Sequence, residues 1–266
     1  MIHEEEIEKS LYDYPQAYDA VMARTDTVVQ SEVRSVTRLL ARHGIGQGRI
    51  LELACGACAH GIPLAQQGFQ VTGIDRSKAM LAEAQRRSQA AGVSVCLQVG
   101  NVSDFALDRA RFDAAIFMFE TFPLITDSES IRSHFASVRR HLRPGGVYIV
   151  DIDAGRRGVH FETGEWGRRT VAFPGGCAEV WHEDLPGDRV GGTNHLVLHC
   201  RICVGDEVHE TRDDWHICLY SPWMLELMTR TLDGWRLDGF YSWRDLSTDI
   251  SEADHYFAVW VVEQAA

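Results

Sequence analysis

Small residues follow a short apolar segment near residue 50, a pattern typical of sites where a ligand approaches the backbone. The apolar segment is Ile50–Ala54, and the residues after it are Cys55-Gly56-Ala57-Cys58-Ala59-His60-Gly61. A second apolar segment ends at Asp75. A carboxylate in that place can accept hydrogen bonds from both hydroxyl groups of a ribose. The pattern therefore indicates a binding site for a cofactor that contains adenosine.

Two cofactors of this kind are compatible with the loop. NAD would use Gly56, Cys58 and Gly61 as a G-x-G-x-x-G motif, whose middle glycine lets the backbone approach the pyrophosphate. Residue 58 is a cysteine, and this counts against NAD. The other candidate is S-adenosylmethionine.

The segment resembles the first motif of the class I S-adenosylmethionine-dependent methyltransferases, in which an acidic residue precedes alternating small residues. Glu52 stands at the acidic position, and the small-residue positions hold Ala54, Gly56 and Cys58. Asp75 matches the ribose-binding acid of the family. The resemblance implies that the chain binds S-adenosylmethionine and releases S-adenosylhomocysteine. It also implies that the Cys58 thiol faces the methionine moiety.

The same resemblance implies further cofactor contacts. The segment after the third predicted strand matches the family's adenine contact. Aromatic rings can stabilise the positive charge of a sulfonium, and the N-terminal helices of the family close over the cofactor, so Tyr14 and Tyr18 are candidates. The further contacts implied in this way are Tyr18, Arg76, Asn101, Val102 and Phe117.

The segment 155–220 resembles the insertion of the small-molecule branch, which includes sugar-amine and glycine N-methyltransferases. Antiparallel strands wall off a substrate chamber in that branch, so methyl transfer to an amine or hydroxyl of a small molecule is implied. Cys218 stands where the branch usually has arginine, and substrate handling is expected to differ. Two alternatives stay open. One is an elimination or cyclisation catalysed on the same fold, and the other is a non-catalytic cofactor-binding partner subunit.

Histidines are concentrated in this insertion and indicate a polar chamber. They are His160, His182, His195, His199, His209 and His216. A histidine can take the proton from an attacking nucleophile near neutral pH. His216 is the first candidate for this base because it lies near the return of the chain to the core domain, and His199 is the second. Glu120 follows the fourth strand, at the edge where doubly wound sheets bind ligands, and is a candidate partner for a substrate amine.

Two Cys-x-x-Cys pairs raise a zinc or redox hypothesis. The pair Cys55 and Cys58 lies inside the cofactor loop. The pair Cys200 and Cys203 lies in a predicted strand, where residues three apart point to opposite faces. No metal site is therefore predicted.

Short apolar segments that alternate with helical segments predict a doubly wound α/β fold. The five parallel strands, each predicted to be buried, are Ile50–Ala54, Phe69–Ile74, Val93–Val99, Phe112–Phe119 and Val147–Ile152. A helix is predicted to begin at Thr126 and to end at Leu142, before Pro144. Ser221 with Pro222 predicts a second helix N-terminus. The later, antiparallel strands are predicted at Ala178–Leu185, Gly192–Val204, Glu207–Tyr220, Trp235–Trp243 and His255–Val262.

The predicted fold class is a Rossmann-like, doubly wound α/β fold. It has a seven-stranded, mostly parallel sheet and an antiparallel β insertion after the fifth strand. Residues 1–44 are expected to form lid helices. Residues 45–154 and 221–266 are expected to form the S-adenosylmethionine-binding domain, and residues 155–220 the insertion that forms the substrate chamber.

Composition limits the partners of the chain. The 26 basic and 38 acidic residues give a formal net charge of −12, which repels nucleic-acid backbones and anionic membranes. The acidity is concentrated after residue 154 and favours a neutral or cationic small-molecule substrate. No apolar segment approaches the roughly 20 residues that span a bilayer, and no signal peptide is recognised. The seven cysteines are therefore expected to be reduced thiols in the cytoplasm. Whether the chain forms a homodimer stays open.

Overall fold

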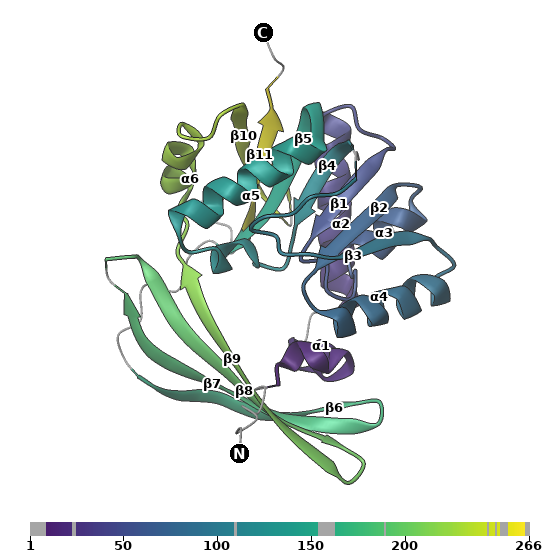
Figure 1. The fold of residues 1–266 in the computed structure, drawn as a ribbon, viewed down its shortest axis with the longest axis vertical. Helices are drawn as coiled ribbons and strands as arrows, with labels where there is room; N and C mark the ends of the chain where they lie inside the picture. The colour runs from purple at the N-terminus through teal and green to yellow at the C-terminus, as the bar shows by residue number, and fades with distance from the viewer. Residues whose placement is uncertain are drawn as a thin grey trace, which may run out of the picture. The chain divides into compact units, whose positions relative to one another are not determined.

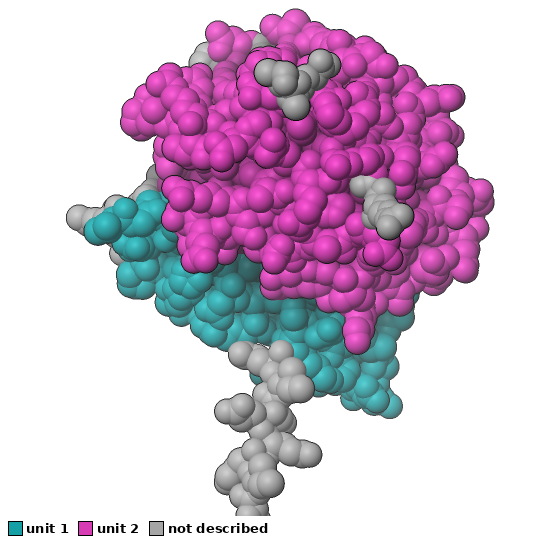
Figure 2. All heavy atoms as spheres, turned by 45° about the horizontal axis from the view of Figure 1, so that its top comes forward, with its two compact units in different colours: residues 1–24, 159–217 teal, residues 25–158, 218–266 magenta. Residues whose placement is uncertain are grey.

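The computed structural model describes residues 9–22, 25–108, 111–153, 163–188, 190–243, 245–247, 249–250 and 255–263. The chain divides into two compact units, which Figure 2 shows in different colours. Unit 1 comprises residues 1–24 and 159–217, and unit 2 comprises residues 25–158 and 218–266. The residues expected to form lid helices are thus divided between the two units. His160 lies outside the described residues.

Unit 2 is built around a seven-stranded sheet with the order β10-β11-β5-β4-β1-β2-β3 (Figure 1). The strands are β1 Arg49–Leu53, β2 Gln70–Asp75, β3 Val95–Val99, β4 Phe112–Phe117, β5 Leu142–Asp153, β10 Trp235–Ser242 and β11 His255–Val262. β11 is antiparallel to β5 and β10, and the other pairs are parallel. This confirms the predicted Rossmann-like sheet. The strand order reverses at β1, between β4 and β2, and ligands bind such sheets beyond the carboxyl ends of the strands there.

The predicted bounds of the parallel strands differ from the structure most at the fifth, because β5 begins at Leu142 and not at Val147. Two further differences have a clear physical cause. The prediction that each is buried is wrong for β3, which lies at the sheet edge and leaves Val99 58% exposed. An edge strand lacks a neighbour on one side. The fourth strand is predicted to reach Phe119, but β4 ends at Phe117 because Phe119 and Glu120 have positive φ angles of 68° and 54°.

Helices cover both faces of this sheet. They are α2 Asp26–Arg42, α3 Gly61–Gln66, α4 Lys78–Ala90, α5 Ser128–His141 and α6 Pro222–Thr229, with a short 3₁₀ helix, η2, at Phe122–Leu124. Val150 packs in a core cluster with α5 and α6, whereas its neighbour Ile149 packs in a second cluster with α2, α3 and α4. This alternation is what a strand buried on both faces requires. No helix in the described part of the chain has the length and apolar character to cross a membrane.

Capping residues explain where the helices begin. α5 begins at Ser128, since the carboxylate of Asp127 accepts a hydrogen bond from the Ser130 N–H at 2.8 Å. The predicted start at Thr126 is therefore wrong, because the N-cap is Asp127, whose carboxylate accepts the hydrogen bond from a free amide of the first turn. The predicted N-terminus of α6 is confirmed, with Ser221 accepting a hydrogen bond from the Met224 N–H at 3.2 Å.

Unit 1 contains a four-stranded sheet with the order β6-β7-β8-β9. Its elements are η1 Leu11–Asp13, α1 Pro15–Met22, β6 Gly164–Phe173, β7 Gly176–Asp188, β8 Thr193–Val204 and β9 Glu207–Cys218. β7 is antiparallel to both β6 and β8, which confirms the antiparallel character of the insertion. β6 has no counterpart in the prediction. Most of its residues are exposed, so its sequence lacks the apolar alternation that marks a half-buried strand.

One face of the unit 1 sheet is covered by the N-terminal helices. Leu11, Ala17 and Val21 pack in one cluster with apolar residues of β7 and β8. The Leu11 N–H also donates a hydrogen bond to the Asp213 carboxylate on β9 at 2.9 Å. These contacts attach the first described residues to the inserted sheet.

Candidate active site

The loop between β1 and α3 has an alternating left-handed backbone. The φ angle is 47° at Ala54, 51° at Gly56 and 60° at Cys58. Glycine adopts this conformation freely, whereas a side chain there costs about 1 to 2 kcal/mol. The Cys55 N–H donates to the Ile74 carbonyl at 2.9 Å and anchors the loop to β2. Strained backbone of this kind persists where the surroundings hold it, and it is common at ligand sites.

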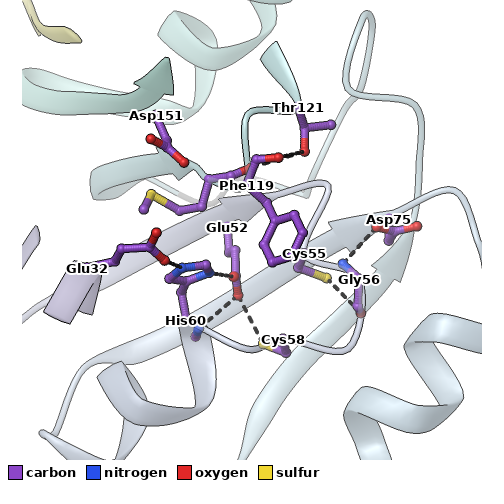
Figure 3. A network of polar contacts seen from close by, with 12 residues as sticks. Glu32, Glu52, Cys55, Gly56, Cys58, His60, Asp75, Phe119, Thr121 and Asp151 are labelled. Atoms are coloured by element: carbon purple, nitrogen blue, oxygen red, sulfur yellow. Dashed lines mark hydrogen bonds and ion pairs between the residues drawn. The ribbon is translucent and has the colours of Figure 1, made fainter. Parts of the chain in front are cut away.

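Asp75 ends β2 and its carboxylate faces the loop backbone (Figure 3). Its Oδ2 accepts a hydrogen bond from the Gly56 N–H at 2.8 Å, and its Oδ1 accepts one from the Ser77 N–H at 2.8 Å. Burial raises the pKa of Asp75 above its ordinary value, although both amide hydrogen bonds oppose this. A carboxylate offers about four lone-pair sites, so both oxygens keep capacity for the hydroxyl groups of a ribose. The geometry around Asp75 therefore fits the ribose that the sequence predicts at this position.

The Cys58 thiol points toward the carboxylate of Glu52 (Figure 3). It is fully buried and donates a hydrogen bond to Glu52 Oε2 at 3.1 Å, and the Gly61 N–H donates to the same oxygen at 3.0 Å. The expectation that this thiol faces the methionine moiety is therefore wrong, because the buried carboxylate of Glu52 requires donors on its own side of the loop. Hydrogen bonding with Cys55, burial and the charge of Glu52 raise the pKa of the Cys58 thiol well above its ordinary value.

His60 lies between two buried carboxylates. Its Nε2 is 2.7 Å from Glu32 Oε2 and its Nδ1 is 3.7 Å from Glu52 Oε1. Burial alone would lower the pKa of His60, but the hydrogen bonds with the two glutamates raise it to about 9. This contact is not among the sequence-based predictions. A signal was available, because Glu32 lies beside Val29 and Val33 in the buried stripe of α2.

A second strained turn follows β4 at the same edge of the sheet. The Glu120 N–H donates to Asp151 Oδ2 at 3.3 Å, and the Thr121 hydroxyl donates to the Met118 carbonyl at 3.0 Å. Glu120 Oε1 lies 3.3 Å from Nδ1 of His255, the first residue of β11. Asp151 is buried and is absent from the predicted site. Its position at the end of an apolar strand is the signal that would have found it.

Asn101 and Val102, which are predicted to contact the adenine, lie in a segment that is bonded to α5 through His134. The His134 ring donates from Nδ1 to the Val102 carbonyl at 2.7 Å, because a carbonyl can only accept. Its Nε2 then accepts from the Tyr148 hydroxyl at 2.6 Å. Burial lowers the pKa of His134 to about 4, so the ring is neutral. The exposed Asn101 accepts a hydrogen bond from the Ser103 N–H at 3.0 Å, which shapes the turn.

The shifted pKa values of His60 and His134 predict a stability maximum near neutral pH. His60, whose folded pKa is raised to about 9, contributes stability that is complete below its unfolded pKa of 6.5 and is lost as the pH rises through 9. His134, whose folded pKa is lowered to about 4, opposes folding as the pH falls from 6.5 toward 4. Each effect is on the order of 3 kcal/mol, at about 1.4 kcal/mol for each pH unit between the folded and unfolded pKa.

Urea unfolding between pH 4 and pH 9 (roughly the span of the two folded pKa values) measures this curve. His60→Gln is expected to flatten its alkaline side and His134→Gln its acid side. An alkaline side that is unchanged in His60→Gln would contradict the assignment of a charged His60.

Two other predicted cofactor residues, Arg76 and Phe117, differ in their exposure. Arg76 is exposed and follows Asp75 directly. Phe117 is fully buried in the core, with its ring centroid 5.4 Å from that of His134 and 6.2 Å from that of Phe122. Phe117 therefore lies in the core rather than on the loop.

The remaining predicted site residues lie in unit 1. His199 Nε2 is 2.9 Å from Glu183 Oε2, and its ring stacks on Trp181 at 5.0 Å. His216 stacks on His195 at 4.2 Å, and His195 Nε2 lies 2.9 Å from Asp214 Oδ1. Alternation along β8 puts His195 and His199 on one face, as predicted.

Tyr14 and Tyr18 both make ring contacts within unit 1. The ring of Tyr18 lies 5.1 Å from the ring of Tyr12, and that of Tyr14 lies 5.1 Å from His209. The predicted residues are therefore found in two groups. One lies in unit 2, at the loop after β1 and at the ends of neighbouring strands, and the other lies on the helices and sheet of unit 1.

A comparison with protein families identifies the part of the chain that holds the loop. Residues 50–146 match a family model described as a methyltransferase domain. This part of the chain is therefore similar to a methyltransferase domain. The matched segment contains the loop after β1, Asp75, Asn101 and the turn after β4.

Known relatives agree with this assignment. Over 139 residues the chain is 27% identical to dTDP-3-amino-3,4,6-trideoxy-alpha-D-glucopyranose N,N-dimethyltransferase of Streptomyces venezuelae, covering 52% of this chain and 56% of that protein. The chain spans about half the length of the curated relatives it matches.

Solved structures share the fold over nearly the whole chain. An S-adenosylmethionine-dependent methyltransferase from Clostridium acetobutylicum superposes with a TM-score of 0.75 at 16% identity, covering 93% of this chain and 96% of that one. A sugar N-methyltransferase from Streptoalloteichus superposes with a TM-score of 0.72 at 17% identity, covering 99% and 97%. The methyltransferase fold therefore extends beyond the matched domain and includes the inserted strands.

Proposed function

We propose that this chain transfers a methyl group from S-adenosylmethionine to an amine of a small molecule. The observation that carries the proposal is the left-handed loop after β1 together with Asp75, whose two oxygens are oriented by the amides of Gly56 and Ser77. This is a cradle for an adenosine ribose at the reversal point of a doubly wound sheet. S-adenosylmethionine contains that ribose and supplies an activated methyl group.

In this reaction the amine lone pair forms a bond to the methyl carbon as the carbon–sulfur bond breaks. The sulfur keeps the bonding electrons, which leaves S-adenosylhomocysteine, and the nitrogen loses a proton. The protein's main task is to hold nucleophile, methyl carbon and sulfur in line, and such positioning can be worth roughly 7 to 11 kcal/mol. Asp75 and the loop would hold the nucleoside, while Asn101 and Val102 would contact the adenine.

The acceptor proposed is a small amine such as an amino sugar. The Streptomyces venezuelae relative is named for an amino sugar nucleotide, and the Streptoalloteichus structure for a sugar. The acidic net charge of −12 favours a neutral or cationic acceptor. Glu120, half-buried beside the turn after β4, would pair with the amine. The chamber role of residues 155–220 stays a prediction, as does a homodimer, which light scattering would detect.

Mass spectrometry of the product tests the function. The protein is incubated with S-adenosylmethionine and a panel of dTDP-linked amino sugars, glycine and small hydroxyl compounds. Gain of one or two methyl groups on an amine, with equimolar S-adenosylhomocysteine, is the expected result. A changed mass without methyl gain would indicate elimination or cyclisation instead. Binding of S-adenosylmethionine without any product across the panel would favour a non-catalytic partner subunit.

Cys58→Gly is expected to keep the affinity for S-adenosylhomocysteine within tenfold, which is about 1.4 kcal/mol. The thiol points toward Glu52, and glycine relieves the strain of a φ angle of 60°. The variant loses the hydrogen bond to Glu52, and this cost of roughly 1 kcal/mol offsets the relief of strain, so its free energy of unfolding is expected to stay within about 1 kcal/mol of wild type.

Calorimetry and urea unfolding measure the two quantities. Cys58→Ala is the matched control, because it removes the thiol but keeps the strained side chain. A larger loss of affinity in Cys58→Gly than in Cys58→Ala would mean that the loop needs a side chain at residue 58.

A further inference from the structure

Three buried ionisable groups lie together beneath the cofactor loop. Glu32 comes from α2, Glu52 from β1, and His60 from the residue before α3. Glu32 and Glu52 are each 2% exposed and His60 is 3% exposed. Figure 3 shows both carboxylates directed toward the imidazole ring. We call these three residues the His60 network.

Charges buried to this extent must be paired or they cost several kcal/mol each. A protonated His60 can donate from both ring nitrogens, one toward each glutamate. The hydrogen bond to Glu32 is short, at 2.7 Å, and the contact to Glu52 is longer, at 3.7 Å. Glu32 therefore holds the ring, and the ring presents positive charge to Glu52.

Glu52 connects the His60 network to the backbone of the loop. Its Oε1 faces His60, while its Oε2 accepts hydrogen bonds from the Gly61 N–H and the Cys58 thiol. A Cβ on Gly61 would collide with Glu52 Oε2 and with the Cys58 sulfur, so the carboxylate fits this backbone without spare room. Rotation of Glu52 would remove the acceptor for the Cys58 thiol and the Gly61 N–H, which are the two ends of the second half of the loop.

The first half of the loop depends on the same anchor. The Cys58 N–H donates to the Cys55 carbonyl at 2.7 Å, and Gly56 between them donates its N–H to Asp75. A shift of Cys58 would therefore move the backbone that orients Asp75. A displacement of about 1 Å at a site of this kind can cost as much as a hundredfold in function.

We propose that His60, held by Glu32, is a positioning residue for the cofactor loop. It contacts no cofactor itself and acts through Glu52, whose orientation sets the loop in the shape that binds the nucleoside. The proposal rests on the proposed function, since it concerns the affinity of the loop for the S-adenosylmethionine family of ligands. Glu32 is thus expected to affect the affinity for these ligands, although it lies on α2 and outside the loop.

A double-mutant cycle measured with S-adenosylhomocysteine tests the proposal. The variants are Glu32→Gln, His60→Leu and the double variant, with calorimetry performed well below each melting temperature. Each single variant is expected to lose about tenfold or more in affinity. The double variant is expected to lose no more than the worse single variant, because both changes break one connection. His60→Gln, which keeps a polar side chain, is expected to recover part of the affinity lost in His60→Leu.

Asp113→Asn is the matched control. Asp113 is also a paired carboxylate, which accepts hydrogen bonds from the Arg49 N–H at 2.8 Å and from Arg143 Nε at 2.6 Å. It lies near the N-terminal end of β4, whereas the candidate site lies at the carboxyl ends of the strands. Its substitution is expected to lower the melting temperature without changing the affinity. If the His60 network only stabilises the fold, the variants of Glu32 and His60 are expected to behave as Asp113→Asn does, with a lower melting temperature and unchanged affinity.

The pH profile supplies a second readout. Among the described residues, the titratable groups in contact with the ring are Glu32 from α2 and Glu52 from β1. Wild-type affinity is expected to fall as the pH rises through about 9, where His60 loses its proton, and the profile of His60→Leu is expected to stay flat over that range.

Equal affinities in wild type, Glu32→Gln and His60→Gln would overturn the proposal, whatever happens to stability. This would hold even if His60→Leu did not fold. Failure of wild type itself to bind S-adenosylhomocysteine is a different result, because it would remove the proposed function.

Discussion

Asp75→Ala is expected to weaken binding of S-adenosylhomocysteine by about 3 kcal/mol, which is more than a hundredfold. The loss corresponds to two charge-assisted hydrogen bonds from the ribose hydroxyl groups, at about 1.5 kcal/mol each. The same substitution also removes the acceptor for the Gly56 N–H, which lies 2.8 Å from Asp75 Oδ2. The full effect is therefore expected to be at least this large.

Calorimetry measures the loss, and two variants interpret it. Asp75→Asn keeps the shape but removes the charge and half of the acceptor capacity, so its affinity is expected to lie between wild type and Asp75→Ala. Asp206→Ala, in the exposed turn between β8 and β9, is a control and is expected to bind as wild type does. If Asp75→Ala binds within threefold of wild type (about 0.7 kcal/mol), the ribose assignment is wrong.

His216→Ala is expected to lower turnover by roughly 10² to 10⁴-fold while leaving cofactor affinity nearly unchanged. A base that takes the proton of the nucleophile acts in the transition state and contributes little to cofactor binding. His216 lies against His195, which bonds Asp214, so a carboxylate and a second imidazole lie beside the proposed base. If His216 only lines the wall of the substrate chamber, its substitution is expected to lower turnover a few-fold.

His199→Ala separates the two candidate bases. His199 is oriented by Glu183 at 2.9 Å, which is the arrangement of a histidine held by a carboxylate. Single-turnover kinetics of both variants show which histidine carries the larger effect. His43→Ala, at the end of α2, is a control with no expected change. Unchanged turnover in both His216→Ala and His199→Ala would leave Glu120 as the proton acceptor, or a substrate that arrives deprotonated.

The sequence by itself determined the fold class and the position of the loop, because both depend on local patterns. Short apolar segments between helical ones predict parallel strands, and a strand followed by small residues predicts the turn of a ligand loop. Asp75 is likewise local, since it ends the strand that follows the loop. Proline and serine at the helix ends act within a few residues, and the N-terminus of α6 was predictable for this reason.

Only the tertiary structure decided how side chains from distant segments pair. The bond between His60 and Glu32 joins residues 28 positions apart on different elements, and nothing local specifies it. The direction of the Cys58 thiol depends on the buried carboxylate of Glu52 and on a left-handed backbone angle. The exposed strand β6 carries no apolar alternation, so its pairing with β7 and its contacts with the N-terminal helices define it. Local rules place the loop along the chain, whereas the burial of charges beneath it is a property of the packed fold.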